Sequence, residues 1–147
     1  MQGGQFQFKL DQTNLIKAGT IPVIAAAVAG LIWILGFNIL TALIALVAII
    51  IFAFAGYWYV NLVLKSGTTP TIVDVAINGA ILGAVISLVY GIAAGIGISI
   101  ATSGFYGVLG SAPGSGGLIG TVFQGAISGA VGAGGWVACK TGMIKTK

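Results

Sequence analysis

The chain contains no histidine, no arginine and no glutamate, and it has a single cysteine. Without histidine or arginine, imidazole metal sites, histidine proton relays and arginine clamps on phosphate are excluded. Cys139 has no second cysteine with which to form an internal disulfide. Its position beside Lys140 would suit acylation, but we interpret Cys139 as a small, buried apolar residue. We therefore predict a protein that is not an enzyme and that holds no cofactor and no metal ion.

Charged residues of either sign are also scarce. They make up 5% of the 147 residues, while 58% are hydrophobic. Soluble domains carry roughly 25% charged residues, so this chain has too few of them to cover a surface that faces water. We predict an integral membrane protein with the lipid bilayer as its partner. The net charge of +4 is too small and too dispersed to predict a nucleic-acid partner, and it suits an anionic leaflet better.

The apolar residues fall into four runs, which predict an all-α fold of four transmembrane helices. Pro22 should lie in the first turn of the first helix, where its missing N–H costs little, and Thr13 or Asn14 should cap that helix. A polar N-terminal tail precedes the bundle and a basic tail follows it. The predicted ranges are 1–17 for the N-terminal tail, 18–140 for the bundle and 141–147 for the C-terminal tail, with spans at 18–36, 39–64, 73–103 and 118–138.

Two connections are informative. The turn Gly36-Phe37-Asn38 is so short that the first two helices should form an antiparallel hairpin. Thr71 and Asp74 have capping-box spacing at the start of the third helix. A carboxylate at that position complements the positive end of the helix, so we interpret Asp74 as a helix-start residue rather than a proton or cation site.

Small residues recur at every fourth position of the third span. Side chains four apart lie on one face of a helix, so they form a smooth strip, here called the small-residue row, that another helix can approach closely. Steps of four advance about 400° and the row winds around the axis, so we expect at least two close neighbours, within the chain or in a partner subunit. The fourth span has a shorter pattern of the same kind. The predicted glycine-zipper residues are Gly79, Gly83, Ser87, Gly91, Gly95 and Ser99, ending at Ser103, and Gly125, Gly129 and Ala133.

The lysines predict the orientation. Four spans place both chain ends and Lys65 on one side, and the two loops on the other side carry no charge. By the positive-inside rule, we predict a multi-pass protein of the cell membrane with both termini cytoplasmic.

Few polar residues lie inside the spans. Gln124, Asn78 and Tyr90 are candidates for a polar path, and a hydrogen bond to another helix is the favoured role for Gln124. Tyr90 needs a partner for its hydroxyl group. Outside the spans, the alternating segment 5–11 is either an edge-pairing strand or a tail whose aromatic residues enter the interface. The glycine-rich loop at 104–117 is interfacial or partly re-entrant.

The segment 56–85 carries three short motifs. They are Tyr59-Val60 at a helix end, the loop Lys65-Ser66-Gly67, and the pattern Asp-x-Ala-x-x-Gly-Ala-x-x-Gly from Asp74 to Gly83. Together they resemble an uncharacterised family of small four-span archaeal and bacterial membrane proteins. The resemblance covers the central fifth of the chain. It implies a four-span layout and a prokaryotic source, and it brings no activity with it.

Three functions are compatible with these features. The first is a structural or accessory subunit of a homo- or hetero-oligomeric membrane assembly, joined through small-residue helix packing. The second is a small channel or transporter for ions or small neutral solutes. The third is a membrane-remodelling protein. The scarcity of ionisable residues within the spans favours the first, because solute pathways usually contain them.

Overall fold

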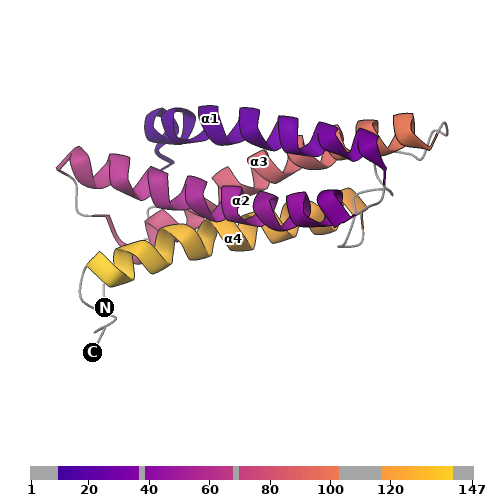
Figure 1. Ribbon diagram of the computed structural model, residues 1–147. Helices are drawn as coiled ribbons and strands as arrows, with labels where there is room; N and C mark the ends of the chain where they lie inside the picture. Colours follow the sequence, from indigo (N-terminus) through magenta and orange to yellow (C-terminus); the bar gives the residue numbers. More distant parts are fainter. Residues whose placement is uncertain (1–9, 37–38, 68–69, 103–116, 141–147) are drawn as a thin grey trace.

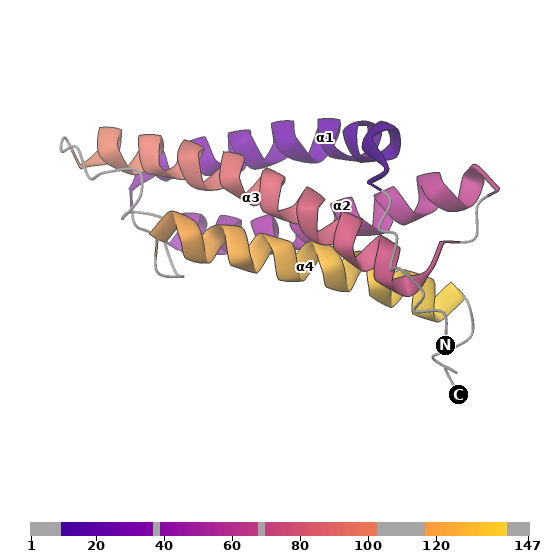
Figure 2. The ribbon, with the colours of Figure 1, turned by 180° about the vertical axis from the view of Figure 1, so that it is seen from behind.

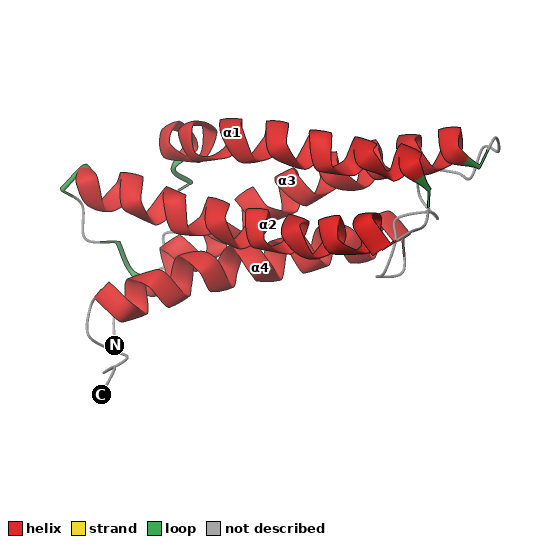
Figure 3. Cartoon of the chain, viewed as in Figure 1, coloured by secondary structure: helices red, strands yellow, loops and turns green. Residues whose placement is uncertain are grey.

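The computed structural model describes residues 10–36, 39–67, 70–102 and 117–140. Every regular element in these ranges is helical (Figures 1 and 3). Helix α1, Gln12–Leu31, continues into the short 3₁₀ helix η1, Ile32–Leu35, and is followed by α2, Ile39–Lys65, by α3, Ile72–Ala101, and by α4, Gly117–Lys140. The predicted all-α fold is confirmed. Residues 1–9, Ser103, the loop up to 116 and the tail at 141–147, all of which carried predictions, lie outside the described residues.

Four segments are long and apolar enough to span a membrane: α1 together with η1, α2, α3 and α4, of 24, 27, 30 and 24 residues. A hydrocarbon core about 30 Å thick needs roughly 20 helical residues. The structure therefore has the layout of a multi-pass membrane protein. The observed bounds of α2, α3 and α4 lie within two residues of the predicted ones.

The helices alternate in direction along the bundle. The start of α1, the end of α2, the start of α3 and the end of α4 therefore lie at one end (Figures 1 and 2). We call this the charged end, because all charged residues of the described ranges belong to these four helix ends: Asp11, Lys17, Lys65, Asp74 and Lys140.

Helix α3 is the centre of the bundle. It packs against α1, η1, α2 and α4, most extensively against α4. In its most apolar stretch, 61% of residues are buried, against 22–39% in the other three spans. Outward faces are apolar as well; α4, for example, exposes the stripe Ile119, Phe123, Ile127 and Val131. Apolar residues both inside and outside are expected where lipid is the solvent.

Helix α1 begins earlier than predicted, at Gln12 rather than near residue 18. The cap is Asp11, and the predictions of Thr13 or Asn14 are wrong. One Asp11 carboxylate oxygen accepts a hydrogen bond from the backbone N–H of Asn14 at 3.2 Å, and the other accepts from the Asn14 side-chain amide at 2.8 Å. A carboxylate at this position satisfies free N–H groups and the helix dipole at once.

The early start places Pro22 inside α1 rather than in its first turn, so that prediction is also wrong. Proline has no N–H to donate to the carbonyl four residues back, and its ring crowds that carbonyl, which bends a helix. Figure 1 shows the first turns of α1 at an angle to the rest of the helix. The bend carries the beginning of α1 in a different direction from the part that lies along α3.

The start of α3 follows the prediction. Thr71 is the N-cap, and its hydroxyl oxygen accepts a hydrogen bond from the Asp74 backbone N–H at 3.1 Å. The same hydroxyl donates to the Asp74 carboxylate at 2.7 Å. In a standard capping box the acidic side chain would bond the backbone of the cap residue, whereas here it bonds the side chain. Asp74 is thus a helix-start residue.

Helices α1 and α2 lie antiparallel, as the short connection predicted. Gly36 ends η1 with a φ of +79°, in the left-handed region that favours glycine. Its N–H donates to the Trp33 carbonyl at 3.0 Å, and its own carbonyl accepts from the Thr41 hydroxyl at 3.1 Å. Gly36 is therefore bonded to η1 through its N–H and to α2 through its carbonyl.

Candidate functional site

The small-residue row of α3 lies against the small residues of α4. A Cβ atom added to Gly83 would overlap the carbonyl oxygen of Gly125, and one added to Gly125 would overlap the Ser87 side chain. A Cβ on Gly79 would lie 2.6 Å from the Ala133 Cβ. We call this contact, formed by Gly79, Gly83 and Ser87 of α3 and Gly125, Gly129 and Ala133 of α4, the α3–α4 seam. Backbones this close leave no room for larger side chains.

The remainder of the row has other surroundings. An added Cβ on Gly91 would lie 2.6 Å from the end of the Leu118 side chain rather than against a backbone. Gly95 is buried, and its carbonyl accepts a hydrogen bond from the half-buried Ser99 hydroxyl at 2.8 Å within the same helix. The close approach to the backbone of α4 is therefore seen in the first half of the row, at Gly79 and Gly83.

Helix α2 joins the seam at a third close contact. Gly56 faces the carbonyl oxygen of Gly129, and an added Cβ there would lie 3.0 Å from the Ala133 backbone nitrogen. One turn further, Gly132 of α4 faces the carbonyl of Ala53. Sequence reasoning missed Gly56, which belongs to no row of small residues. Gly132 stands with Ser128 beside the predicted row of α4, but their spacing does not show which helix they meet.

The far half of α3 packs against α1 and η1. A Cβ on Gly30 would lie 2.6 Å from the Tyr90 carbonyl oxygen, and a Cβ on Gly97 would lie 2.9 Å from the Ile34 nitrogen. Helix α3 thus has close neighbours on two sides, both within the chain. Gly97 was missed because it stands outside the four-residue spacing of the row, whereas Ala26 and Gly30, both buried, form a small-xxx-small pair that signals this contact.

Two of the three candidate path residues share a pocket. Gln124 and Tyr90 line a pocket of about 170 Å³ between α2, α3 and α4, together with Thr121, Phe52, Ala45, Leu46, Ala48 and Ile49. The Tyr90 hydroxyl accepts a hydrogen bond from the Trp33 indole N–H at 2.9 Å, and the Phe52 ring meets the Tyr90 ring edge-on at 5.9 Å. Tyr90 thus has the partner that it was expected to need. The Gln124 amide, in contrast, makes no hydrogen bond with any residue that the structure describes.

Asn78 lies far from this pocket, near the charged end. It is 1% exposed. Its amide nitrogen donates to the Asp74 carbonyl at 2.9 Å, and its amide oxygen accepts from the Asp11 N–H at 3.3 Å. It therefore ties the start of α1 to α3. Tyr90 is twelve residues further along α3, roughly 18 Å away at 1.5 Å per residue, so the three polar residues do not lie together.

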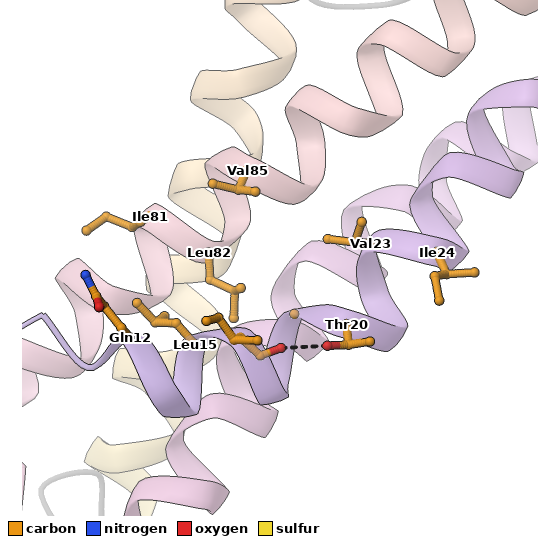
Figure 4. A pocket seen from close by; sticks show the side chains of 10 residues that line it. Gln12, Leu15, Thr20, Val23, Ile24, Ile81, Leu82 and Val85 are labelled. Atoms are coloured by element: carbon orange, nitrogen blue, oxygen red, sulfur yellow. Dashed lines mark hydrogen bonds between the residues drawn. The ribbon is translucent and has the colours of Figure 1, made fainter.

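A second hollow is larger and almost wholly apolar. A groove of about 620 Å³ runs between the first half of α1 and α3 (Figure 4). Gln12 lies at one end, and Thr20, two turns further along α1, donates its hydroxyl to the Ile16 carbonyl at 2.8 Å. The walls are formed by Leu15, Val23 and Ile24 of α1 and by Ile81, Leu82 and Val85 of α3. The bend at Pro22 falls within the stretch of α1 that lines this groove.

Aromatic residues gather at the charged end. The Trp136 ring meets Tyr57 edge-on at 4.6 Å, and the Lys140 ammonium lies 5.2 Å from the centre of the Trp136 ring. Aromatic rings followed by lysine are typical of helices that reach a membrane interface. Cys139, next to this cluster, is exposed, so its predicted burial is wrong. In the described ranges, no three His, Cys, Asp or Glu side chains come close enough to hold a metal ion.

Comparison of the chain with protein-family models, with curated proteins and with solved structures found no match.

Proposed function

We propose that the protein is a non-catalytic, multi-pass protein of the cell membrane that acts as a structural or accessory subunit of a membrane assembly. The observation that supports this best is the apolar groove between α1 and α3, whose walls carry exposed side chains such as Val85, 49% exposed, and Ile24, 61% exposed. The proposed partner is a transmembrane helix of a second copy or of another subunit.

The small-residue packing has a different role in this proposal. The α3–α4 seam behaves as a glycine zipper that holds one chain together, because its glycines face one another within the monomer. With those faces covered, a partner helix needs another surface. The groove supplies one, since side chains of a partner helix can enter the space between α1 and α3 as ridges enter grooves.

We further propose that both termini are cytoplasmic. Lys17, Lys65 and Lys140 all belong to the charged end of the bundle, while the described residues of the other end carry no charge. A basic end facing the cytoplasm follows the positive-inside rule. Labelling of a cysteine at Ser66 from one side of sealed vesicles checks this orientation.

The subunit proposal is tested by photo-crosslinking in native membranes. A photoreactive amino acid at Val85, in the groove, is expected to give a discrete protein adduct whose partner segment mass spectrometry identifies. The matched control is Ile127, which is 64% exposed on the outward face of α4 and should give lipid adducts alone. Lipid adducts alone at both positions would remove the groove as a subunit interface.

The pocket of Gln124 and Tyr90 supports an alternative function, a small channel or transporter for small neutral solutes. Intramembrane polar groups often mark such pathways, and none of the described residues that line this pocket is charged. Flux of small neutral solutes into proteoliposomes tests this alternative. A flux no greater than that of protein-free liposomes would reject it.

A further inference from the structure

The pocket beside Gln124 exists because α2 and α4 approach each other unevenly. They meet backbone to backbone where Gly132 faces Ala53 and Gly56 faces Gly129. Nearer the uncharged end, Ala48 and Ile49 of α2 and the half-buried Gln124 of α4 line a partly open pocket of about 170 Å³ instead. Small residues let the two helices touch in one half of this interface, whereas in the other half a space remains between them.

Two polar side chains that line this pocket, Gln124 and Tyr90, have hydrogen-bonding groups without a partner among the described residues. A glutamine amide offers two N–H donors and one carbonyl acceptor, and none of them is bonded to a residue in the described part of the chain. The Tyr90 hydroxyl oxygen accepts from Trp33, and its O–H hydrogen has no acceptor among those same residues. Thr121 adds a hydroxyl that donates to the Gly117 carbonyl at 3.1 Å.

Gln124 lies well inside the predicted hydrocarbon layer. It is seven residues from the start of α4, which is roughly 10 Å along the helix axis. An amide without partners in an apolar environment costs several kcal/mol, so its donors and acceptor need a polar molecule. The lining residues that the structure describes carry no charge to recognise an ion. One water occupies about 30 Å³ in the liquid, so the pocket has room for a few.

We propose that this pocket binds a small cluster of water molecules that hydrogen-bond to the Gln124 amide and to the Tyr90 hydroxyl. The cluster links α4 to α3 and, through Trp33, to the end of the first span. Water satisfies both groups because each molecule donates and accepts. This inference is independent of transport, since a hydrated pocket needs no continuous path across the membrane.

The test uses cysteine reactivity in the full chain in lipid nanodiscs, with Cys139→Ser as the background. Methyl methanethiosulfonate reacts with the thiolate, and a thiol ionises only where water reaches it. A cysteine introduced by Gln124→Cys is expected to react about tenfold faster or more than one introduced by Ile127→Cys. Ile127 is the matched control, because it lies less than one turn further along α4 on the outward, lipid-facing side.

Equal rates at the two positions, whether both slow or both fast, would overturn the proposal. A second measurement leaves the chain unaltered, so it does not depend on how the cysteine variants fold. In protein labelled with ¹⁵N-glutamine, water-edited NMR spectra should show rapid transfer from water to the Gln124 side-chain amide, identified by its loss in Gln124→Leu. Transfer from lipid acyl chains alone would also overturn the proposal. Exposed Gln12, at the charged end, is the positive control.

Discussion

Replacement of Gly83 by alanine tests the α3–α4 seam most directly. The added methyl group would overlap the Gly125 carbonyl oxygen and would lie 2.8 Å from the Gly125 carbonyl carbon and 3.1 Å from the Gly129 Cα. These atoms belong to the backbone of α4, so no side-chain rotation relieves the overlap. The two helices must move apart, and the contacts around Gly56 and Gly79 then loosen with them.

The magnitude follows from a matched pair. Gly135→Ala, on α4, the other helix of the seam, adds a methyl group with nothing within 4 Å. Both substitutions gain about 0.5–1 kcal/mol from the lower backbone entropy of alanine. Only Gly83→Ala pays for overpacking, typically 1–3 kcal/mol. The two variants should therefore differ in unfolding free energy by roughly 1–3 kcal/mol, with Gly135→Ala the more stable.

Unfolding in mixed micelles of mild detergent and dodecyl sulfate, followed by helical circular dichroism, measures this difference. Gly91→Ala should fall between the two variants, because it meets the end of the Leu118 side chain, which can move. If Gly83→Ala proved as stable as Gly135→Ala, the close approach of the α3 and α4 backbones would be refuted.

Three further substitutions have defined outcomes in the same unfolding assay. Tyr90→Phe removes the hydroxyl that accepts from the Trp33 N–H and should cost about 1–3 kcal/mol. A double-mutant cycle with Trp33→Phe should show a coupling of about 0.6 kcal/mol. A coupling of zero would argue against this hydrogen bond. Thr71→Val removes the cap of α3 and should cost about 1 kcal/mol, whereas the same change at Thr20, an exposed residue inside α1, should have a smaller effect. Gly36→Ala should lower the unfolding free energy by about 1 kcal/mol, because a φ of +79° is strained for alanine. Steric overlap plays no part, since nothing lies within 4 Å of an added Cβ. An unchanged unfolding free energy would show that the backbone at Gly36 adapts.

The helices could be predicted from the sequence because each apolar run is long and bounded by polar residues. The start of α3 was also predictable, since Thr71 and Asp74 act within one turn of the chain. The start of α1 was not predicted. Asp11 lies two residues before Thr13 and three before Asn14, the expected caps, and takes their role. Its backbone N–H also donates to Asn78 on another helix. That contact depends on tertiary packing, and it moves Pro22 into the interior of the helix.

The candidate sites were predictable only in part. The four-residue spacing identified small residues in α3 and α4, but spacing does not reveal which face meets which helix. Gly56 belongs to no row of small residues, and Gly97 and Gly132 stand beside the predicted rows rather than in them. Their close contacts are therefore seen only when the helices are packed together. Gln124 was recognised as unusual from its apolar surroundings, yet the expected bond to another helix is not made with any described residue. The reason is a gap between α2 and α4 that no local sequence feature encodes.

The sequence by itself determined the number of helices, their apolar character and the position of the described charges at one end, because these follow from composition and from order along the chain. Tertiary structure decided which backbones touch, where Pro22 bends α1 and where a groove and a polar pocket remain. These features depend on where small and large side chains meet when the helices pack against one another. Glycine lets two helices meet at one point, and the larger side chains a few turns away then keep them apart.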